Sequence, residues 1–345
     1  MACNKVEQFR VQRGFSLSGL ARLVGISRQS LYSIEAGHQV PKVYLAMAIA
    51  SALGSDVAEV FPGEGSKEFR FDIQRKAPGA VSAYVTEIDG EAVIRQSSAA
   101  GFAAPPTAAD ALVRVVDLRY EVESEIGRSG MFMDGCDPVL GLISSRINER
   151  SGGFKLRWFY GSNRDSLTKL HRKLTHCALM HGEAADMGDE VDKSEGYFVL
   201  PLGRWEIALC FAAQNPKNIK SLTDLLRPDI RFASREVGSG VRQFVDHRLA
   251  EFGTETARVP GSVTFGGHYQ VAAAVELGLC DAGIVPASIA ESQGLGFVSV
   301  GEHQSSLVFS KDGYALASEQ GILDLANSAS FSKEVAVMGG YQLVS

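Results

Sequence analysis

The fold of the N-terminal part is decided by residues 13–37, RGFSLSGLARLVGISRQSLYSIEAG. Apolar side chains recur there every three or four residues on both sides of Gly25, which is the spacing of two short amphipathic helices. Ser16 and Ser27 each stand just before one of these helices, where a side-chain oxygen can cap free N–H groups. Gly25 permits the positive φ that a tight turn requires. The stretch therefore predicts a helix-turn-helix.

The second of these helices has one apolar face and one polar face. Ile26, Leu31 and Ile34 hold it against the core, and the small side chain of Ala21 lets the first helix cross it closely. The polar side chains can bond base edges or phosphates in the major groove of DNA. They are Ser27, Arg28, Gln29, Ser30, Tyr32 and Ser33. We interpret the segment as a DNA-binding unit, and a helical bundle used for protein association is the alternative.

Residues 4–61 resemble the phage-repressor-like (XRE-type) helix-turn-helix family. The resemblance rests on Leu20-Ala21, Gly25-Ile26-Ser27, Ile34-Glu35-Ala36-Gly37, Pro41 and Val60-Phe61. It implies that residues 27–33 form the recognition helix and that Ser16 and Ser18 lie beside the DNA backbone. It also implies that Arg10 pairs with Glu35. Many relatives carry glutamine where this chain has Ser18, which removes one phosphate contact of the family pattern.

Charge is distributed unevenly along the chain. The 345 residues have a formal net charge of −6. Residues 1–62 hold six basic and four acidic side chains, so this part carries +2 and the remainder carries −8. A small basic unit joined to an acidic body suits a DNA-binding domain that carries a second module.

Composition excludes several classes of protein. The hydrophobic content of 45% and the charged content of 21% are ordinary globular values. No apolar run reaches the ~18 residues of a membrane span, and residues 1–10 lack the apolar stretch of a signal peptide. We therefore expect a cytoplasmic protein with no membrane partner. The five cysteines are scattered and have no metal-ligand spacing, so we expect reduced thiols, no metal and no cofactor.

The chain divides into three predicted parts: a helix-turn-helix domain over 1–62, a connector over 63–110 and an α/β domain over 111–345. Within the connector, two runs rich in β-formers flank Asp89-Gly90 and predict a hairpin with a type I′ turn. Residues 97–109, rich in Ala and Pro, predict a linker. Strand and helix patterns then alternate, which favours a sheet of largely parallel strands. The predicted strands are 131–133, 155–160, 177–180, 198–200, 207–212, 230–233, 282–285 and 297–300.

Glycine-rich junctions follow several of these strands. A helix start there presents unpaired N–H groups and a positive dipole end, and glycine lets a ligand approach the backbone. Gly238 to Arg242, with Arg235 just upstream, offers amides, a hydroxyl and guanidinium groups that match a tetrahedral oxyanion or a carboxylate. The candidate ligand-binding residues are Cys136, Asp137, Gly161, Ser162, His181, Arg235, Gly238, Ser239, Gly240, Arg242, His268 and Tyr269.

Most of these residues also have a structural interpretation. Cys136 can be a redox switch, a ligand contact or simply a small buried side chain. Asp137 suits the N-cap of a helix, since its carboxylate repels an anion. His181 and His268 can donate to an oxyanion or be hydrogen-bonded core residues, and Tyr269 can be core. No nucleophile–base pair, carboxylate pair or zinc spacing emerges, so we predict no catalytic site.

Residues 111–320 resemble class II periplasmic-binding-protein-like domains, in particular the molybdate-binding-like domain fused to helix-turn-helix regulators. The resemblance rests on GCDPVLGL (135–142), NPKNIKSLTDL (215–225), RFASR (231–235), GSGVR (238–242) and the stretch 272–284. It implies two lobes joined by crossing strands, with hinge segments at 205–212 and 305–309, that close on a ligand. Relatives have threonine where this chain has Val241, so one hydroxyl ligand is missing.

Together these features predict a ligand-responsive transcription regulator that binds double-stranded DNA as a homodimer. Its predicted effector is a small oxyanion similar to molybdate or tungstate. One alternative keeps DNA binding but replaces the oxyanion by a small organic anion, such as a carboxylate or a phosphonate. The other alternative is an enzyme that uses the α/β module on an anionic substrate.

Overall fold

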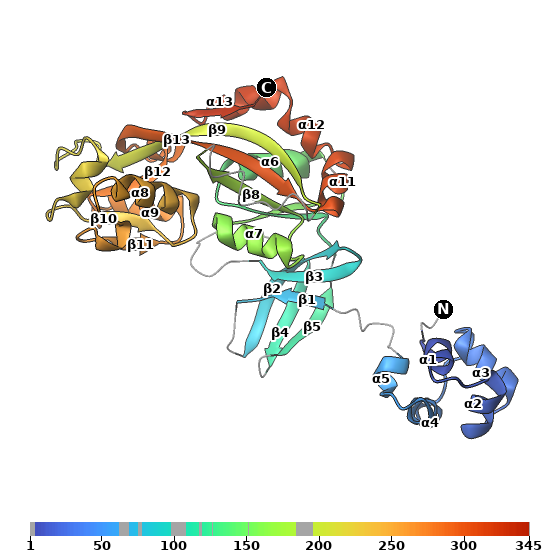
Figure 1. Ribbon diagram of the computed structural model, residues 1–345. Coiled ribbons are helices and arrows are strands. Elements are labelled where there is room, and N and C mark those ends of the chain that lie inside the picture. Colours follow the sequence, from blue (N-terminus) through green and yellow to red (C-terminus); the bar gives the residue numbers. More distant parts are fainter. Residues whose placement is uncertain are drawn as a thin grey trace. The chain divides into compact units, whose positions relative to one another are not determined.

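The computed structural model describes residues 4–61, 69–74, 78–97, 108–116, 119–125, 127–150, 152–183 and 196–344. The chain forms two compact units that divide between residues 68 and 69 (Figure 1). Within the described residues, no helix is long and apolar enough to cross a membrane.

The described residues of the first unit form a bundle of five helices around one small core. They are α1 (Val6–Gln12), α2 (Leu17–Leu23), α3 (Arg28–Glu35), α4 (Val43–Leu53) and α5 (Val57–Val60). Ser16 and Ser27 are the N-caps of α2 and α3, as predicted, because each Oγ accepts a backbone N–H bond at 3.0 Å. Gly25 has a φ of +73° in the turn between these helices. The predicted helix-turn-helix is confirmed.

The second unit begins with a five-stranded sheet in the order β1-β3-β2-β4-β5. Its strands are β1 (Phe69–Asp72), β2 (Gly79–Ile88), β3 (Glu91–Gln96), β4 (Ala111–Val116) and β5 (Arg119–Glu125). The predicted hairpin is β2–β3, and Asp89 and Gly90 both have the positive φ of a type I′ turn. The predicted linker lies mostly outside the described residues.

This sheet contains residues from both sides of the predicted boundary between residues 110 and 111. β4 begins at Ala111 and pairs antiparallel with β2, and β5 then pairs with β4. The free edge of the hairpin needs hydrogen-bond partners, and β4 supplies them by pairing with β2. The β-rich part therefore extends past residue 110.

A second, nine-stranded sheet runs through the rest of the unit in the order β11-β10-β12-β9-β13-β8-β6-β7, and β14 (Tyr341–Leu343) pairs with β9. Lobe 1 contains β6 (Met131–Asp134), β7 (Leu156–Phe159), β8 (Cys177–Gly182), α6 (Val139–Arg150) and α7 (Asn163–His171). Lobe 2 contains β10 (Phe232–Arg235), β11 (Val263–Phe265), β12 (Ala282–Pro286), α8 (Gly240–Ala250), α9 (His268–Glu276) and α10 (Ala287–Ser292). After the last crossing strand come α11 (Lys311–Glu319), α12 (Ile322–Ala326) and α13 (Ala329–Ala336).

The two lobes are joined by two long antiparallel strands, β9 (Phe198–Phe211) and β13 (Gly296–Phe309), which run side by side in Figure 1. The segments 198–200 and 207–212, predicted as separate strands, are the two ends of β9. The prediction of a largely parallel sheet holds within each lobe but is wrong at the centre. There β9 is antiparallel to β12 and β13, and β13 is antiparallel to β8.

The five-stranded sheet is anchored on lobe 1 by a buried ion pair. The guanidinium of Arg95 on β3 donates to Asp134 at the end of β6 (Nη2 to Oδ1, 2.8 Å) and to Asp72 on β1 (3.0 Å). It also lies 3.7 Å from the ring centroid of Phe159. Arg95 is only 2% exposed. Because breaking a buried, hydrogen-bonded pair is costly, the sheet and lobe 1 form one packed body.

Candidate functional site

The predicted DNA-binding residues lie in α2 and α3 or directly before them. Ser16, Ser18, Ser27, Arg28, Gln29 and Tyr32 are exposed, and Ser30 and Ser33 are partly buried. Tyr32 is 60% exposed although its neighbour Leu31 is fully buried, so the helix turns its apolar face inward and its polar face outward. This arrangement leaves the side chains of α3 free to reach a major groove.

The ion pair implied by the family resemblance is present. Arg10 on α1 donates to Glu35 on α3 through Nε (2.6 Å) and Nη2 (3.0 Å), and its Nη1 donates to the backbone oxygen of Phe15. The hydrogen bond to Glu35 raises the pKa of Arg10 above its ordinary value. A bidentate pair that is largely buried holds α1 and α3 in one geometry and so orients the recognition helix.

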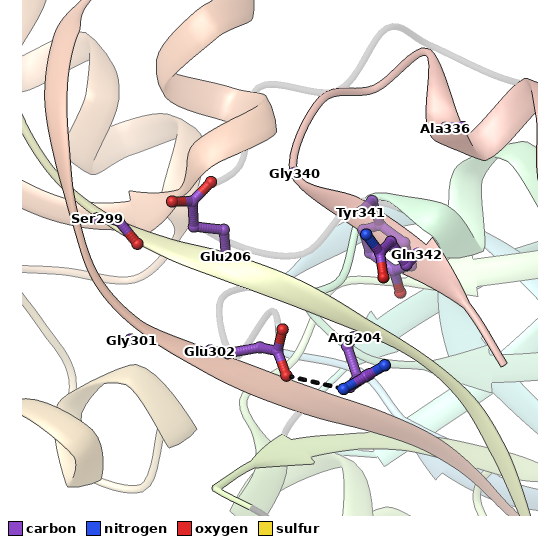
Figure 2. A pocket seen from close by; sticks show the side chains of 9 residues that line it. All are labelled: Arg204, Glu206, Ser299, Gly301, Glu302, Ala336, Gly340, Tyr341 and Gln342. Atoms are coloured by element: carbon purple, nitrogen blue, oxygen red, sulfur yellow. Dashed lines mark ion pairs between the residues drawn. The ribbon is translucent and has the colours of Figure 1, made fainter.

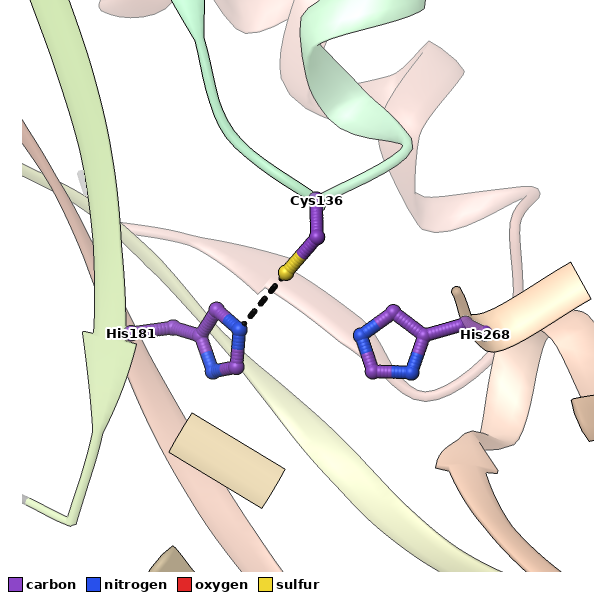
Figure 3. Close-up of side chains that lie close together, drawn as sticks. All are labelled: Cys136, His181 and His268. Carbon is purple, nitrogen blue, oxygen red and sulfur yellow. Dashed lines mark hydrogen bonds between the residues drawn. The ribbon is translucent and has the colours of Figure 1, made fainter. Parts of the chain in front are cut away.

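A second candidate site lies where the lobes meet. Cys136 follows β6, His181 lies on β8, Arg235 ends β10, His268 begins α9 and His303 lies on β13. Figure 3 shows a hydrogen bond between Cys136 and His181, with the ring of His268 turned toward them. All five side chains are at most 2% exposed. We call this group the interlobe cluster.

Short contacts link the members of the interlobe cluster. Cys136 Sγ lies 2.9 Å from His181 Nε2, and His181 Nδ1 lies 3.0 Å from His303 Nδ1. Burial raises the pKa of the Cys136 thiol to about 12. Burial also lowers the pKa of His303 to about 3 and holds the pKa of His181 well below its ordinary value. The sequence alone did not predict this thiol–imidazole pair. The raised pKa keeps the Cys136 thiol neutral, and a neutral thiol is a poor nucleophile.

Arg235 determines which nitrogen of His268 carries a proton. Arg235 Nη1 lies 3.0 Å from His268 Nδ1, and a guanidinium has no acceptor, so Nδ1 must accept this bond. Burial, and then the charge of Arg235, lower the pKa of His268 well below its ordinary value, so the ring is neutral. The proton is therefore on Nε2, which is buried and has no protein partner among the described residues. His268 offers an unused N–H donor between the lobes.

This donor pattern bears on metal binding. The ligand atoms of Cys136, His181 and His268 lie within 4.8 Å of one another, a spacing that could hold a metal ion. A metal needs a nitrogen lone pair, however, and the Nε2 of His268 carries a proton because Nδ1 faces Arg235. The nearby guanidinium also repels a cation. The arrangement therefore fits a ligand that accepts hydrogen bonds better than it fits a metal.

The guanidinium of Arg235 is paired with the carboxylate of its neighbour Glu236. Its Nε and Nη2 both donate to Glu236 at 2.8 Å. Burial alone would lower the pKa of Arg235, but the nearby Tyr160 and the hydrogen bond to Glu236 hold that pKa above its ordinary value. The side chain of Arg235 is 1% exposed and that of Glu236 is 29% exposed. A carboxylate thus occupies, from the solvent side, the position that an anionic ligand would take on this guanidinium.

The remaining predicted residues divide between the edge of the cluster and more distant positions. Ser239 is the buried N-cap of α8, and a Cβ at Gly240 would collide with the backbone oxygen of His181. Arg242 donates to Asp246 and to the backbone oxygen of Arg235. Gly238 has a φ of +94°, which favours glycine.

On the lobe 1 side, Ser162 is the N-cap of α7, and Gly161 packs against Ser166 and Asp165. Asp137 accepts a bond from the backbone N–H of Val139 at the start of α6, and its second oxygen accepts from Ser305 and Tyr341. This agrees with the capping interpretation. Tyr269 is 38% exposed, so its core interpretation is wrong.

The lobes touch each other directly around the cluster. The backbone N–H of Arg164 in lobe 1 donates to the backbone oxygen of Gly238 in lobe 2 (3.2 Å). The backbone N–H of His268 donates to Tyr160 Oη across the same boundary (3.1 Å). These contacts describe lobes that are closed on each other, with the cluster enclosed between them.

A separate cavity of about 640 Å³ lies at the hinge (Figure 2). It is lined by Arg204, Glu206, Ser299, Gly301, Glu302, Ala336, Gly340, Tyr341 and Gln342. Gly301 follows an irregularity in the pairing of β13 with β9. None of the candidate ligand-binding residues lines this cavity.

A helix-turn-helix unit joined to a two-lobed sheet domain defines the class of DNA-binding regulators with an attached ligand-binding domain. Family models agree: a helix-turn-helix model matches residues 6–60, and a PBP superfamily domain model matches residues 144–327. The chain belongs to the PBP superfamily and carries an XRE-type helix-turn-helix domain at its N-terminus. It is thus a helix-turn-helix transcriptional regulator with a PBP-like ligand-binding domain.

Individual relatives cover each part. The protein YvgK of Bacillus subtilis (strain 168) is 26% identical over 226 residues, which are 63% of this chain and 72% of YvgK. The HTH-type transcriptional regulator YgzD of the same strain is 38% identical over 58 residues, 17% of this chain and 88% of YgzD. A solved substrate-binding protein with bound phosphate from Clostridium perfringens is 14% identical, with a TM-score of 0.49, covering 62% of this chain and 99% of that one.

Two groups in the site were not predicted from the sequence. His303 lies in the middle of β13, and only the pairing of that strand with β8 and β9 brings it to His181. Glu236 stood next to a predicted arginine, and this adjacency was the one available signal. His303 lies at no glycine-rich junction, whereas Glu236 stands between Arg235 and Gly238 of one such junction.

Proposed function

We propose that the PBP-like domain of this regulator senses a small anion, which binds at Arg235 and His268 between the lobes and changes the DNA affinity of the helix-turn-helix. The bound group is an oxyanion, either free, as in molybdate or tungstate, or as the charged end of an organic molecule. The regulator acts in the cytoplasm, where its DNA is, and binds a two-fold operator as a homodimer.

The observation that supports this proposal most directly is the burial of Arg235 together with its hydrogen bonds to Glu236 and His268. Its guanidinium is buried between the lobes, it holds a carboxylate in bidentate geometry, and it forces the neighbouring His268 to present an N–H donor. Buried guanidinium groups and neutral N–H donors select for anions with several acceptor oxygens. An entering anion would replace the Glu236 carboxylate on Arg235. His268 Nε2, which no described residue satisfies, is a further donor within the same enclosed cluster.

The five-stranded sheet, which is anchored on lobe 1, gives a route from the ligand to the DNA. Asp134, which binds Arg95, ends β6 two residues before Cys136 of the cluster. The five-stranded sheet therefore moves with lobe 1 when the lobes open or close. Because the helix-turn-helix precedes this sheet in the chain, lobe movement would change how two DNA-binding units of a dimer are presented.

Enzymatic use of the same site is the weaker alternative. Cys136 and His181 resemble a nucleophile and its base, but burial raises the pKa of the thiol and lowers the pKa of the imidazole. Both shifts favour the neutral pair, which lacks the thiolate that cysteine catalysis needs.

The proposal is tested by titrating the full chain with molybdate, tungstate, sulfate, phosphate and a set of small carboxylates and phosphonates in a calorimeter. At least one anion should bind the native protein, and Arg235→Gln should abolish that binding. Arg227→Gln is the matched control, because Arg227 is paired with Asp229 on the surface of lobe 2, away from the cluster. Binding that survives Arg235→Gln, or is absent from the native protein with every anion, would contradict the proposal.

A further inference from the structure

A second pocket, of about 410 Å³, begins beside the interlobe cluster. Pro138 follows Asp137 in lobe 1, and Tyr269 follows His268 in lobe 2. The other walls are formed by α10 and by the segment between α13 and β14. The lining residues are Pro138, Tyr269, Ser288, Ile289, Glu291, Ser292, Val337 and Met338. Pro138 thus stands two residues after Cys136, and Tyr269 directly follows His268, so each lobe contributes to the pocket a residue close in the chain to the cluster.

The chemistry of this pocket differs from that of the cluster. Pro138, Ile289, Val337 and Met338 are apolar and Tyr269 presents an aromatic ring. Glu291 adds a carboxyl group, and the described lining includes neither lysine nor arginine. A bare inorganic oxyanion would find no positive charge here. The volume lies in the range of roughly 300–1,000 Å³ that is typical of sites for small organic molecules.

One polar atom of the lining has no partner. Ser288, near the start of α10, is 7% exposed, and its Oγ makes no hydrogen bond with any described residue. A buried hydroxyl without a partner is unfavourable, since it has lost water and gained nothing in return. A hydroxyl or carbonyl group of a ligand in this pocket would satisfy it. Val337, which is 86% exposed, is apolar surface that the same ligand would cover.

We propose that the effector is an organic anion with two parts. Its carboxylate or phosphonate binds at Arg235 and His268, and its body fills the pocket with a hydroxyl or carbonyl against Ser288. This inference rests on the proposed function, because it assigns the charged end to the same site. It narrows the effector from any oxyanion to one that carries an apolar body with at least one polar substituent.

The test compares inorganic phosphate and molybdate with phenylphosphonate, benzoate and 3-hydroxybenzoate on the full chain, by calorimetry. The best organic anion should bind at least about tenfold more tightly than either inorganic anion, which corresponds to roughly 1.4 kcal/mol. Equal or tighter binding of the inorganic anions would overturn the inference.

Two variants locate the organic body. Val337→Trp fills the pocket from its exposed rim, where the fold tolerates a large side chain, and should weaken organic anions about tenfold while leaving phosphate unchanged. Leu277→Trp, at a position that is 72% exposed and outside the pocket lining, is the control and should change neither. Ser288→Ala should weaken 3-hydroxybenzoate more than benzoate, and it should not destabilise the fold because the hydroxyl has no partner.

The outcomes separate the two proposals. If Arg235→Gln leaves all anion binding intact, the proposed function fails. If anion binding requires Arg235 but Val337→Trp does not weaken the organic anions, the anion site stands and the organic body is wrongly placed.

Discussion

Removing the negative charge of Glu236, whose carboxylate is paired with Arg235, should increase the affinity of the protein for its anion. Glu236→Gln preserves the size and shape of the side chain and removes its charge. Two unit charges about 4 Å apart attract by about 4 kcal/mol at an effective dielectric of 20. Hydration of the partly exposed Glu236 offsets much of this attraction, because 29% of its side chain is accessible to water. The competition that an entering anion must overcome is then about 1–2 kcal/mol, or about 5- to 30-fold in affinity.

The assay is calorimetric titration of the native chain and of Glu236→Gln with the same anions. The variant should bind the preferred anion about 5- to 30-fold more tightly, and the gain should be largest at low salt. Glu334→Gln is a matched control, since Glu334 forms a bidentate pair with Arg146 on the surface of lobe 1 and should leave the affinity unchanged. An unchanged or weaker affinity in Glu236→Gln would refute the idea that this carboxylate stands where the ligand binds.

Two further predictions concern stability. Arg10→Ala leaves the largely buried Glu35 without its partner and should destabilise the first unit by about 3 kcal/mol, seen as faster hydrogen exchange over residues 6–60; unchanged exchange would contradict this. In the folded protein the pKa values of His181, His268 and His303 are lowered, whereas in the unfolded chain histidine pKa values are about 6.5. Below that pH the unfolded chain therefore binds more protons than the folded protein. Stability is therefore full above about pH 6.5 and should fall by about 1.4 kcal/mol per histidine on acidification to pH 5.5. Urea unfolding, monitored by tryptophan fluorescence, should show this loss. Equal stability at pH 7.5 and pH 5.5 would refute the idea that these histidines are buried in their neutral form.

The helix-turn-helix could be predicted almost residue by residue because its signals are local. Ser16, Ser27 and Gly25 act within three residues of where they stand, through caps and a turn. The β2–β3 hairpin was predictable for the same reason, since Asp89 and Gly90 alone set its turn.

The two-lobed domain was less predictable because its key contacts are long-range. β9 pairs with β13 almost one hundred residues further along the chain, and no local pattern specifies that pairing or its antiparallel sense. The same pairing brings His303 to His181, so the histidine pair could not be found from spacing. The sequence does not show which sheet β4 joins, because an alternating strand has the same pattern in either sheet.

The central claim is that an anion bound at Arg235 changes DNA binding. It is tested most directly by selecting DNA duplexes that bind the full native chain and then measuring their affinity with and without the anion found by calorimetry. Coupling of about 1–3 kcal/mol should change the DNA affinity by about 5- to 150-fold in the native protein. Arg235→Gln should still bind the duplex but should not respond to the anion. If the anion binds the native protein at Arg235 and the DNA affinity does not change, the account is wrong.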